Sequence, residues 1–120
     1  MILTGKCKEE FEKWLEIKDS FLFDKNEDIL KLTELHEHLL NGYLIEFFDS
    51  VGFYIKIYPH LGAGQVVYYP SFIFLDERHL ENERNVVFDN GELYYTLSRL
   101  EAQNEAIKKA NEIYNLLNKD

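Results

Sequence analysis

Residues 43–58 decide the expected fold, and they read YLIEFFDSVGFYIKIY. A run of six mostly apolar residues lies on each side of residues 49–52, and both runs are rich in the aromatic and β-branched residues that favour strands. Asp49 at the first turn position and Gly52 at the fourth fit a type I turn closed by a left-handed glycine. The pattern therefore predicts an antiparallel hairpin.

The predicted turn sets the register of this hairpin. Glu46 would lie opposite Lys56, so one face would be apolar and the other would carry a cross-strand ion pair among aromatic residues. A slip by one residue would destroy both features. The facing apolar pairs are Phe47 with Ile55 and Ile45 with Ile57.

Three amphipathic helices are expected around the hairpin. Apolar residues recur at helical spacing over residues 8–18 and about 27–40. Asn41 followed by Gly42 indicates a helix stop. The third helix covers residues 98–117, where Ser98 and Glu101 form a capping box.

Further strand signals follow the hairpin. Residues 66–75 form a strand that Pro70 interrupts, which suggests an edge position or a bulge. Residues 76–84 form a charged loop or a short helical turn. The Asn-Gly pair at Gly91 predicts a second hairpin that joins residues 86–88 to residues 93–95.

The predicted elements and the composition indicate one α+β domain over residues 1–120. The chain is 46% hydrophobic and 29% charged, which is typical of a folded globular protein. We expect an antiparallel sheet of three to five strands, with the N-terminal helices and the long C-terminal helix packed on one face. The expected core residues are Phe11, Trp14, Ile45, Phe47, Ile55, Ile57, Ile107, Ala110 and Tyr114.

The charge of the chain argues against two classes of partner. Asp and Glu number 22 against 13 Lys and Arg, and the net charge is −9. Nucleic acids and anionic membranes both select cationic surfaces, so neither is an expected partner. The single cysteine cannot form an internal disulfide, and the first residues lack the long apolar stretch of a secretory signal. Both observations predict a cytoplasmic protein.

Polar clusters give little reason to expect catalysis or metal binding. His36 and His38 are two residues apart, so on a helix they diverge, and Glu34 with His38 would make only two ligands. Cys7 with His60 or His79 could form a nucleophile only if they met in space. A small buried side chain is the favoured interpretation of Cys7. No catalytic residue, metal or cofactor is expected.

Two further segments have simple interpretations. Residues 60–65 contain two glycines but lack the lysine of a phosphate-binding loop and the third glycine of a dinucleotide fingerprint, so they predict a plain connection. Four carboxylates crowd the segment that follows, and they form either a solvated loop or an acidic patch that binds a partner. These residues are Asp76, Glu77, Glu81 and Glu83.

Aromatic residues are concentrated in the predicted strands. The expected register leaves Phe48, Tyr54 and Tyr58 on the sheet face away from the helices, together with Tyr68 or Tyr69. An exposed aromatic face is typical of an interface, because tyrosine offers a large rigid area with a polar tip. Either a partner protein or a second subunit covers this face, or the acidic segment folds over it.

Three stretches resemble a family of unknown function. They are residues 99–114 (RLEAQNEAIKKANEIY), 46–55 (EFFDSVGFYI) and 3–8 (LTGKCK). They are similar to parts of small acidic proteins encoded by phages and prophages of Bacteroides-type bacteria, although Leu100 follows Ser98-Arg99 where the family has Thr-Arg before Glu-Ala. The resemblance implies a bacterial host cytoplasm and assigns no site residue.

The order of elements is also similar to that of double-stranded-RNA-binding domains. Those domains contact RNA through a lysine cluster at the start of the last helix. Here Arg99 is the only basic residue at that end, and Lys108 lies more than two turns further on. We therefore do not expect RNA binding.

The expected function is that of a non-enzymatic protein-binding protein. It would be an accessory or host-takeover factor of a phage or prophage, such as an inhibitor of a defence enzyme that presents carboxylates where phosphates would bind. The alternative is a small-molecule or nucleotide-signal binder, with residues 62–64 and tyrosines lining a pocket. Only three arginines are present, which disfavours phosphate binding.

Overall fold

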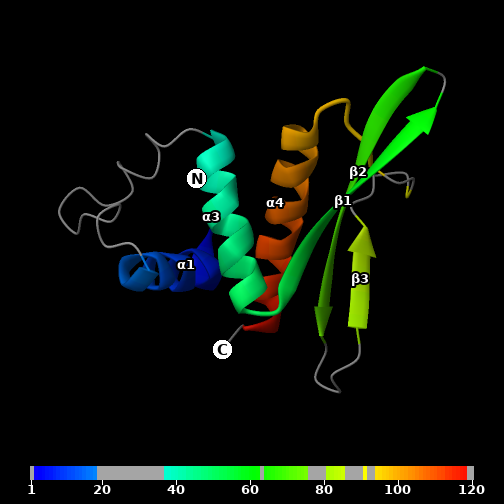
Figure 1. The fold of residues 1–120 in the computed structure, drawn as a ribbon. Coiled ribbons are helices and arrows are strands. Elements are labelled where there is room, and N and C mark those ends of the chain that lie inside the picture. The colour runs from blue at the N-terminus through cyan, green and yellow to red at the C-terminus, as the bar shows by residue number, and fades with distance from the viewer. Residues whose placement is uncertain are drawn as a thin grey trace.

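The computed structural model describes residues 2–18, 37–62, 64–75, 81–85, 91 and 94–118, without the side chains of residues 38, 75 and 81–85. The α+β class is confirmed (Figure 1). The described helices are α1 (Gly5–Lys18), α3 (Glu37–Ser50) and α4 (Arg99–Leu117), and the described strands are β1 (Phe53–Gly62), β2 (Gln65–Leu75) and β3 (Glu81–Asn85).

The described strands form one antiparallel sheet with the order β1-β2-β3. β1 pairs with β2 over its whole length, from Phe53 opposite Phe74 to Gly62 opposite Gln65. β3 pairs with the second half of β2. Nearer the start of β2, Thr96 forms an isolated bridge to Tyr68 on the same side as β3.

Pro70 lies in the central strand, so the predicted edge position is wrong. The register runs through Ile57 opposite Pro70 without an inserted residue, so there is no bulge either. Tyr68 exchanges both of its backbone hydrogen bonds with Thr96, and residues two apart in a strand direct their backbone groups to the same side. The missing N–H of Pro70 therefore faces the side of β2 that carries the Thr96 bridge and β3, one residue before Ser71, where the described pairing with β3 begins.

Residues 43–50 form the second half of helix α3, so the predicted first strand is wrong. Leu40, Leu44, Phe47 and Phe48 recur at helical spacing, and the last three are buried. Asn41 does not end the helix, because its buried Nδ2 donates to Asn104 Oδ1 of α4 at 2.7 Å. Burial against neighbouring elements therefore overrides the local strand preference of this stretch.

The predicted hairpin register is therefore also wrong, because residues 43–48 do not form a strand. Glu46 pairs with Lys18 of α1, at 3.0 Å between Nζ and Oε1, and not with Lys56. Phe47 packs edge-on against Phe11 rather than facing Ile55. The positive φ of Gly52, +86°, agrees with the predicted left-handed glycine, but that glycine links α3 to β1 instead of closing a hairpin.

Other boundaries also differ from expectation. Strand β3 takes up residues 81–84, which were predicted as loop or helical turn, while residues 76–80 lie outside the described residues. Most of the second predicted hairpin and the predicted helix before residue 37 also lie outside them. The C-terminal helix is confirmed, with Ser98 as its N-cap accepting a hydrogen bond from the Glu101 backbone N–H.

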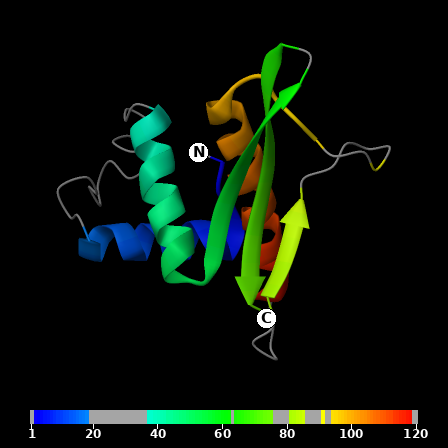
Figure 2. The ribbon, with the colours of Figure 1, turned by 45° about the vertical axis from the view of Figure 1, so that its right-hand side comes forward.

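The core lies where the helices meet the sheet (Figure 2). Helices α3 and α4 contact the strands, and α1 packs against both helices. Phe11, Phe47, Ile107, Ala110 and Tyr114 are buried as predicted, and Trp14, Ile45 and Ile55 are partly buried against them. Ile57 is half-buried and lies outside this cluster. The buried residues of the core are Leu3, Cys7, Phe11, Leu15, Leu44, Phe47, Phe48, Phe53, Phe72, Phe74, Ile107, Ala110 and Tyr114.

Asparagines of α4 hold the start of α1 against the C-terminal helix. Asn111 Oδ1 accepts from the Thr4 backbone N–H at 3.0 Å, and Asn115 Oδ1 accepts from the Cys7 N–H at 2.7 Å. The Thr4 N–H immediately precedes α1 and the Cys7 N–H lies in its first turn, and the helix offers neither of them an internal acceptor. Side chains near the C-terminal end of the sequence therefore cap the N-terminal helix, 107 and 108 residues away.

Candidate protein-contact surface

The side chains of strand β1 alternate between a buried face and an exposed face of the sheet. Phe53 and its Cα partner Phe74 belong to the core, and they define the inner face of the sheet. Side chains alternate along a strand, so Tyr54, Lys56 and Tyr58 lie on the opposite, outer face. Tyr54 is 45% exposed and Tyr58 is 42% exposed. The structure thus places both predicted tyrosines on the surface that turns away from the helices.

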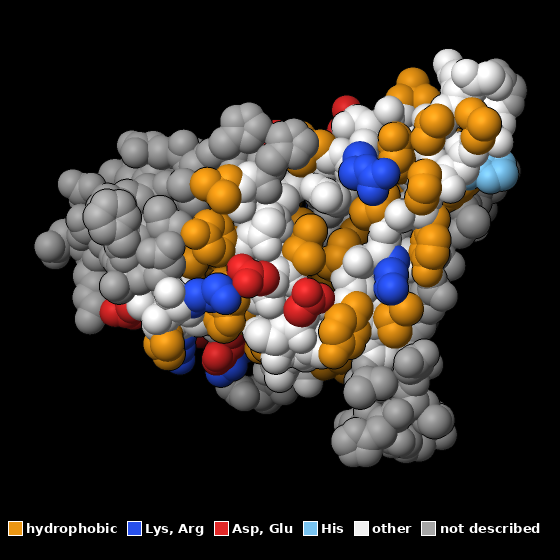
Figure 3. Space-filling view, viewed as in Figure 1, with side chains coloured by type: hydrophobic (Ala, Val, Ile, Leu, Met, Phe, Trp, Pro, Cys, Tyr) orange, Lys and Arg blue, Asp and Glu red, His pale blue; other side chains and the backbone are white. Residues whose placement is uncertain are grey.

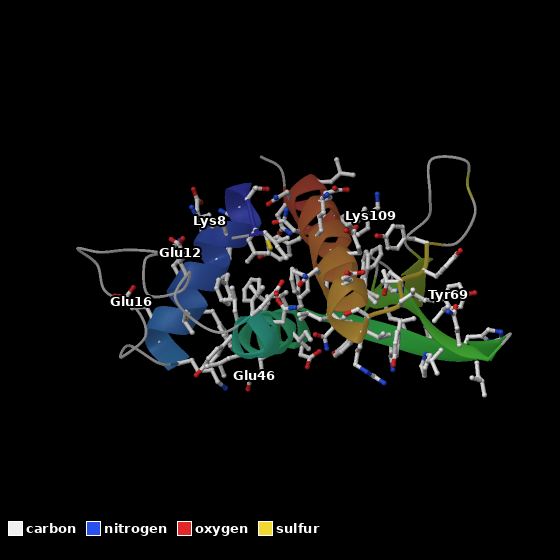
Figure 4. All side chains as sticks on the ribbon, turned by 90° about the horizontal axis from the view of Figure 1, so that it is seen from above. Lys8, Glu12, Glu16, Glu46, Tyr69 and Lys109 are labelled. Carbon is white, nitrogen blue, oxygen red and sulfur yellow. The ribbon has the colours of Figure 1, made fainter. Side chains whose placement is uncertain are left out.

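Further aromatic rings extend this surface. Tyr69 is the Cα partner of Tyr58, and its ring centroid lies 6.2 Å from that of His60 and 6.2 Å from that of Tyr95. Seen from above, the labelled Tyr69 lies on the opposite side of the molecule from Glu12 and Glu16 of α1 (Figure 4). We call Tyr54, Tyr58, Tyr69, Tyr95 and His60 the tyrosine face.

Two of the predicted contact residues lie elsewhere. Phe48 is fully buried in the core, because the helix that replaces the predicted strand turns its side chain inward, so it is not a surface residue. Tyr68 is half-buried on the inner face, where the guanidinium of Arg99 lies 5.1 Å from the centre of its ring. Of the two alternatives, Tyr69 is the one on the outer face.

The predicted acidic residues are only partly placed. Asp76 and Glu77 lie outside the described residues. Glu81 and Glu83 belong to strand β3, where their Cα partners are Leu75 and Ile73 of β2. These two acidic positions therefore follow the edge strand of the sheet and not a loop.

Two members of the tyrosine face, Tyr95 and His60, were not predicted from the sequence. Tyr95 reaches Tyr69 because the bridge between Thr96 and Tyr68 brings its segment alongside β2. That pairing joins residues far apart in the chain, and no local sequence pattern predicts it. His60 would have been found by continuing the alternation of β1 past Pro59, since it follows Tyr58 by two positions.

Cys7 lies in the first turn of α1, and its side chain belongs to the core and has no exposed surface. Burial raises the pKa of its thiol from 9.0 to about 12, so the thiol stays protonated at neutral pH. His60, its predicted partner for nucleophilic chemistry, lies on the tyrosine face, and His79 lies outside the described residues. The structure supports a small buried side chain and gives no support to a nucleophile.

We therefore expect the native protein to react very slowly with a thiol reagent such as Ellman's reagent, and the unfolded protein to react at once. The absorbance of the released thiolate measures the rate, and concentrated guanidinium chloride provides the unfolded control. The free energy of unfolding should also fall as the pH rises above 9.0, because only the unfolded thiol ionises there. Full reaction of the native protein within seconds would show that Cys7 is accessible.

An open hollow of about 410 Å³ lies between the end of α1 and helix α3, lined by Lys18, Leu39, Gly42, Tyr43 and Glu46. The ion pair between Lys18 and Glu46 lies at its wall, and Lys18 also lies over the ring of Trp14. The glycine loop around Gly64 lies elsewhere, at the tip of the β1–β2 hairpin, where a Cβ would meet no atom within 4 Å. The structure therefore does not bring that loop and the tyrosines together around this hollow.

Within the described parts of the chain, no group of three or more His, Cys, Asp and Glu side chains is arranged to hold a metal ion. None of the described helices combines the length and the apolar character needed to cross a membrane. Comparison of the chain with protein-family models, with curated proteins and with solved structures gives no match. The similarity to phage proteins therefore stays a prediction.

Proposed function

We propose that the protein is a non-enzymatic binding protein that engages a protein partner through its tyrosine face. The observation that carries this proposal is the exposure of Tyr54 and Tyr58, 45% and 42%, on the side of the sheet opposite the helices. Monomeric proteins seldom leave a contiguous aromatic surface in water unless it has a binding role. Tyrosine, moreover, loses little conformational entropy on binding and can hydrogen-bond at its tip.

The charges around the tyrosine face indicate the chemistry of the partner. Residues 50–75 contain no Asp or Glu, and Lys56 is the only Lys or Arg among them. Contact at the face is therefore mainly aromatic, with the single positive charge of Lys56 between Tyr54 and Tyr58. The net charge of −9 acts over a longer range and favours the approach of a basic protein surface.

A role as an accessory factor of a phage or prophage is the more specific form of the proposal. It rests on the resemblance that we expect between residues 99–114 and phage-encoded proteins, and on the acidic composition. Glu81 and Glu83 lie in strand β3, beside the central strand that carries Tyr69. A host enzyme that handles nucleic acid offers the basic surface that such an acidic edge would complement.

A double substitution, Tyr54→Glu with Tyr58→Glu, should abolish partner binding without unfolding the protein. Both side chains lie outside the core, so the melting temperature should stay within a few degrees of that of the wild type. The matched control is Leu116→Glu with Leu117→Glu, which adds the same two charges at exposed apolar positions near the end of α4. Affinity capture from the bacterial host, with each captured protein identified, should fail for the first variant only.

The proposal is wrong if the Tyr54→Glu/Tyr58→Glu protein retains every partner of the wild type with unchanged affinity. It is also wrong if the Leu116→Glu/Leu117→Glu control loses partners to the same degree. In that case the added charge, and not the tyrosine face, would explain the loss.

A further inference from the structure

Tyr58, Tyr69 and Tyr95 form a row across the outer face of the sheet. Tyr58 is the Cα partner of Tyr69. The antiparallel bridge that joins the preceding residue of β2 to Thr96 sets Tyr95 opposite Tyr69 on the other side. The centroids of the Tyr69 and Tyr95 rings lie 6.2 Å apart, and the two ring planes are inclined by 59°. Because these rings are inclined and not stacked, neither covers the face of the other.

We propose that the Tyr69–Tyr95 pair receives the guanidinium group of an exposed arginine of the partner protein. The inference rests on the proposed function and names the side chain by which the partner is recognised. The face of an aromatic ring carries partial negative charge, and it attracts a cation within about 6 Å of the ring centroid. A guanidinium group is planar and more weakly hydrated than an ammonium group, so it stacks on a ring at a smaller cost of desolvation.

The chain holds one of its own arginines in the same way on the other face of strand β2. The guanidinium carbon of Arg99 lies 5.1 Å from the centre of the Tyr68 ring. Tyr68 and Tyr69 are successive residues of β2, so their side chains lie on opposite faces of the sheet. Tyr95 is 50% exposed, so an arginine from another protein can reach the outer pair of rings.

The distribution of charge favours a cation at this end of the tyrosine face. The net charge of −9 attracts a basic surface over a long range, but residues 50–75 contain no carboxylate that could pair with it on contact. In the space-filling view, side chains of the hydrophobic class, which includes tyrosine, gather along the β1–β2 hairpin, and no described acidic side chain lies among them (Figure 3). Lys56 repels a cation near its neighbours Tyr54 and Tyr58 on β1. Strand β2 separates Tyr95 from β1, so Tyr95 lies further from this positive charge.

A library of random peptides displayed on filamentous phage is the probe for this inference. The peptides are selected on the immobilised wild-type chain in the presence of excess soluble Tyr69→Leu/Tyr95→Leu chain. This variant keeps the net charge, so it removes every peptide that binds only because it is basic. We expect the remaining peptides to share an arginine. If Tyr69→Leu lowers the melting temperature, Tyr95→Leu alone, at the exposed position, serves as the competitor.

Synthetic copies of the selected peptides then separate the charge of the arginine from its shape. Citrulline has nearly the same shape without the charge, so its exchange for the arginine should weaken binding about tenfold. On the protein, Tyr95→Leu should weaken binding about two- to fivefold, while Tyr95→Phe should keep the affinity of the wild type. Phenylalanines that carry one, two or three ring fluorines at position 95 should weaken binding stepwise, because each fluorine withdraws negative charge from the ring face. A purely apolar contact would not follow the number of fluorines.

Three results would overturn the inference: a selection that yields no peptide dependent on the Tyr69–Tyr95 pair, selected peptides without arginine, or binding that citrulline and ring fluorination leave unchanged. Selected peptides that depend on the pair but not on an arginine would leave the proposed function standing, because the face would still bind a protein segment. The proposed function fails by a different result, the capture of every partner by the Tyr54→Glu/Tyr58→Glu chain. The two failures are therefore distinguishable.

Discussion

Replacing Phe47 by Ala is expected to lower the free energy of unfolding by roughly 3–5 kcal/mol. Phe47 is 1% exposed and lies at the centre of the core. Its ring packs against Phe11 and Trp14 of α1, against the neighbouring Phe48, and against Tyr114 of α4. Truncation would leave a cavity between the three helices. The buried side chains of α1 cannot fill it unless that helix moves.

Urea denaturation followed by tryptophan fluorescence measures this loss, because Trp14 adjoins Phe47. The matched control is Val51→Ala, which removes apolar atoms at an exposed position next to the end of α3 and should cost about 0.5 kcal/mol or less. A loss below about 1 kcal/mol for Phe47→Ala would mean that α3 does not pack against α1 and α4 through Phe47.

Replacing Asn111 by Ala is expected to cost about 1–3 kcal/mol, the second-largest effect. Asn111 is buried, its Oδ1 accepts from the Thr4 backbone N–H, and its Nδ2 donates to Thr4 Oγ1 at 3.1 Å. The substitution leaves the Thr4 N–H with no side-chain acceptor at the start of α1, where the helix itself offers none. The N-terminal segment should therefore detach before the rest of the protein unfolds.

Hydrogen exchange measured by mass spectrometry tests this order, since the amides of the first turn of α1 should lose protection while those of α4 keep theirs. Asn118→Ala makes the same chemical change at an exposed position on the last turn and should cost only a few tenths of a kcal/mol. Equal losses for the two variants would show that the asparagine contacts to Thr4 contribute nothing specific.

Local capping and turn chemistry predicted several features of the fold. Ser98 with Glu101 indicated the start of α4, and Gly52 indicated a left-handed residue at the end of a segment. Both signals depend on backbone geometry within a few residues, so the rest of the chain does not alter them.

The prediction of a strand at residues 43–48 was wrong because the composition of this segment fits the two-residue period of a strand as well as the 3.6-residue period of a helix. Every residue there except Glu46 is apolar, so a two-residue alternation and a helical stripe describe it equally well. The helix prevails because it buries Leu44, Phe47 and Phe48 at once, against α1, α4 and the sheet. Those contacts join distant parts of the chain, and a single segment does not reveal them.

The exposed position of Tyr54 and Tyr58 was predicted correctly although their partner strand was wrong. Their exposure follows from the alternation along β1, which is independent of the strand that pairs with it. Tyr69 could not be distinguished from Tyr68 without the register that sets Tyr69 opposite Tyr58. The inward-facing asparagines of α4, of which Asn111 is buried, could not be predicted either, because a polar residue on a helix ordinarily indicates the solvent side.

Photo-crosslinking from position 58 tests the central claim, binding through the tyrosine face, most directly. A photoreactive phenylalanine analogue replaces Tyr58, which is 42% exposed on the outer face of the sheet, and a second protein carries the analogue at Leu116 as the control. The account predicts that illumination in the host joins position 58, and not position 116, to one defined partner protein. It predicts further that adding excess unlabelled wild-type chain removes the product and that excess Tyr54→Glu/Tyr58→Glu chain does not. Crosslinking from position 116 but not from position 58 would contradict it.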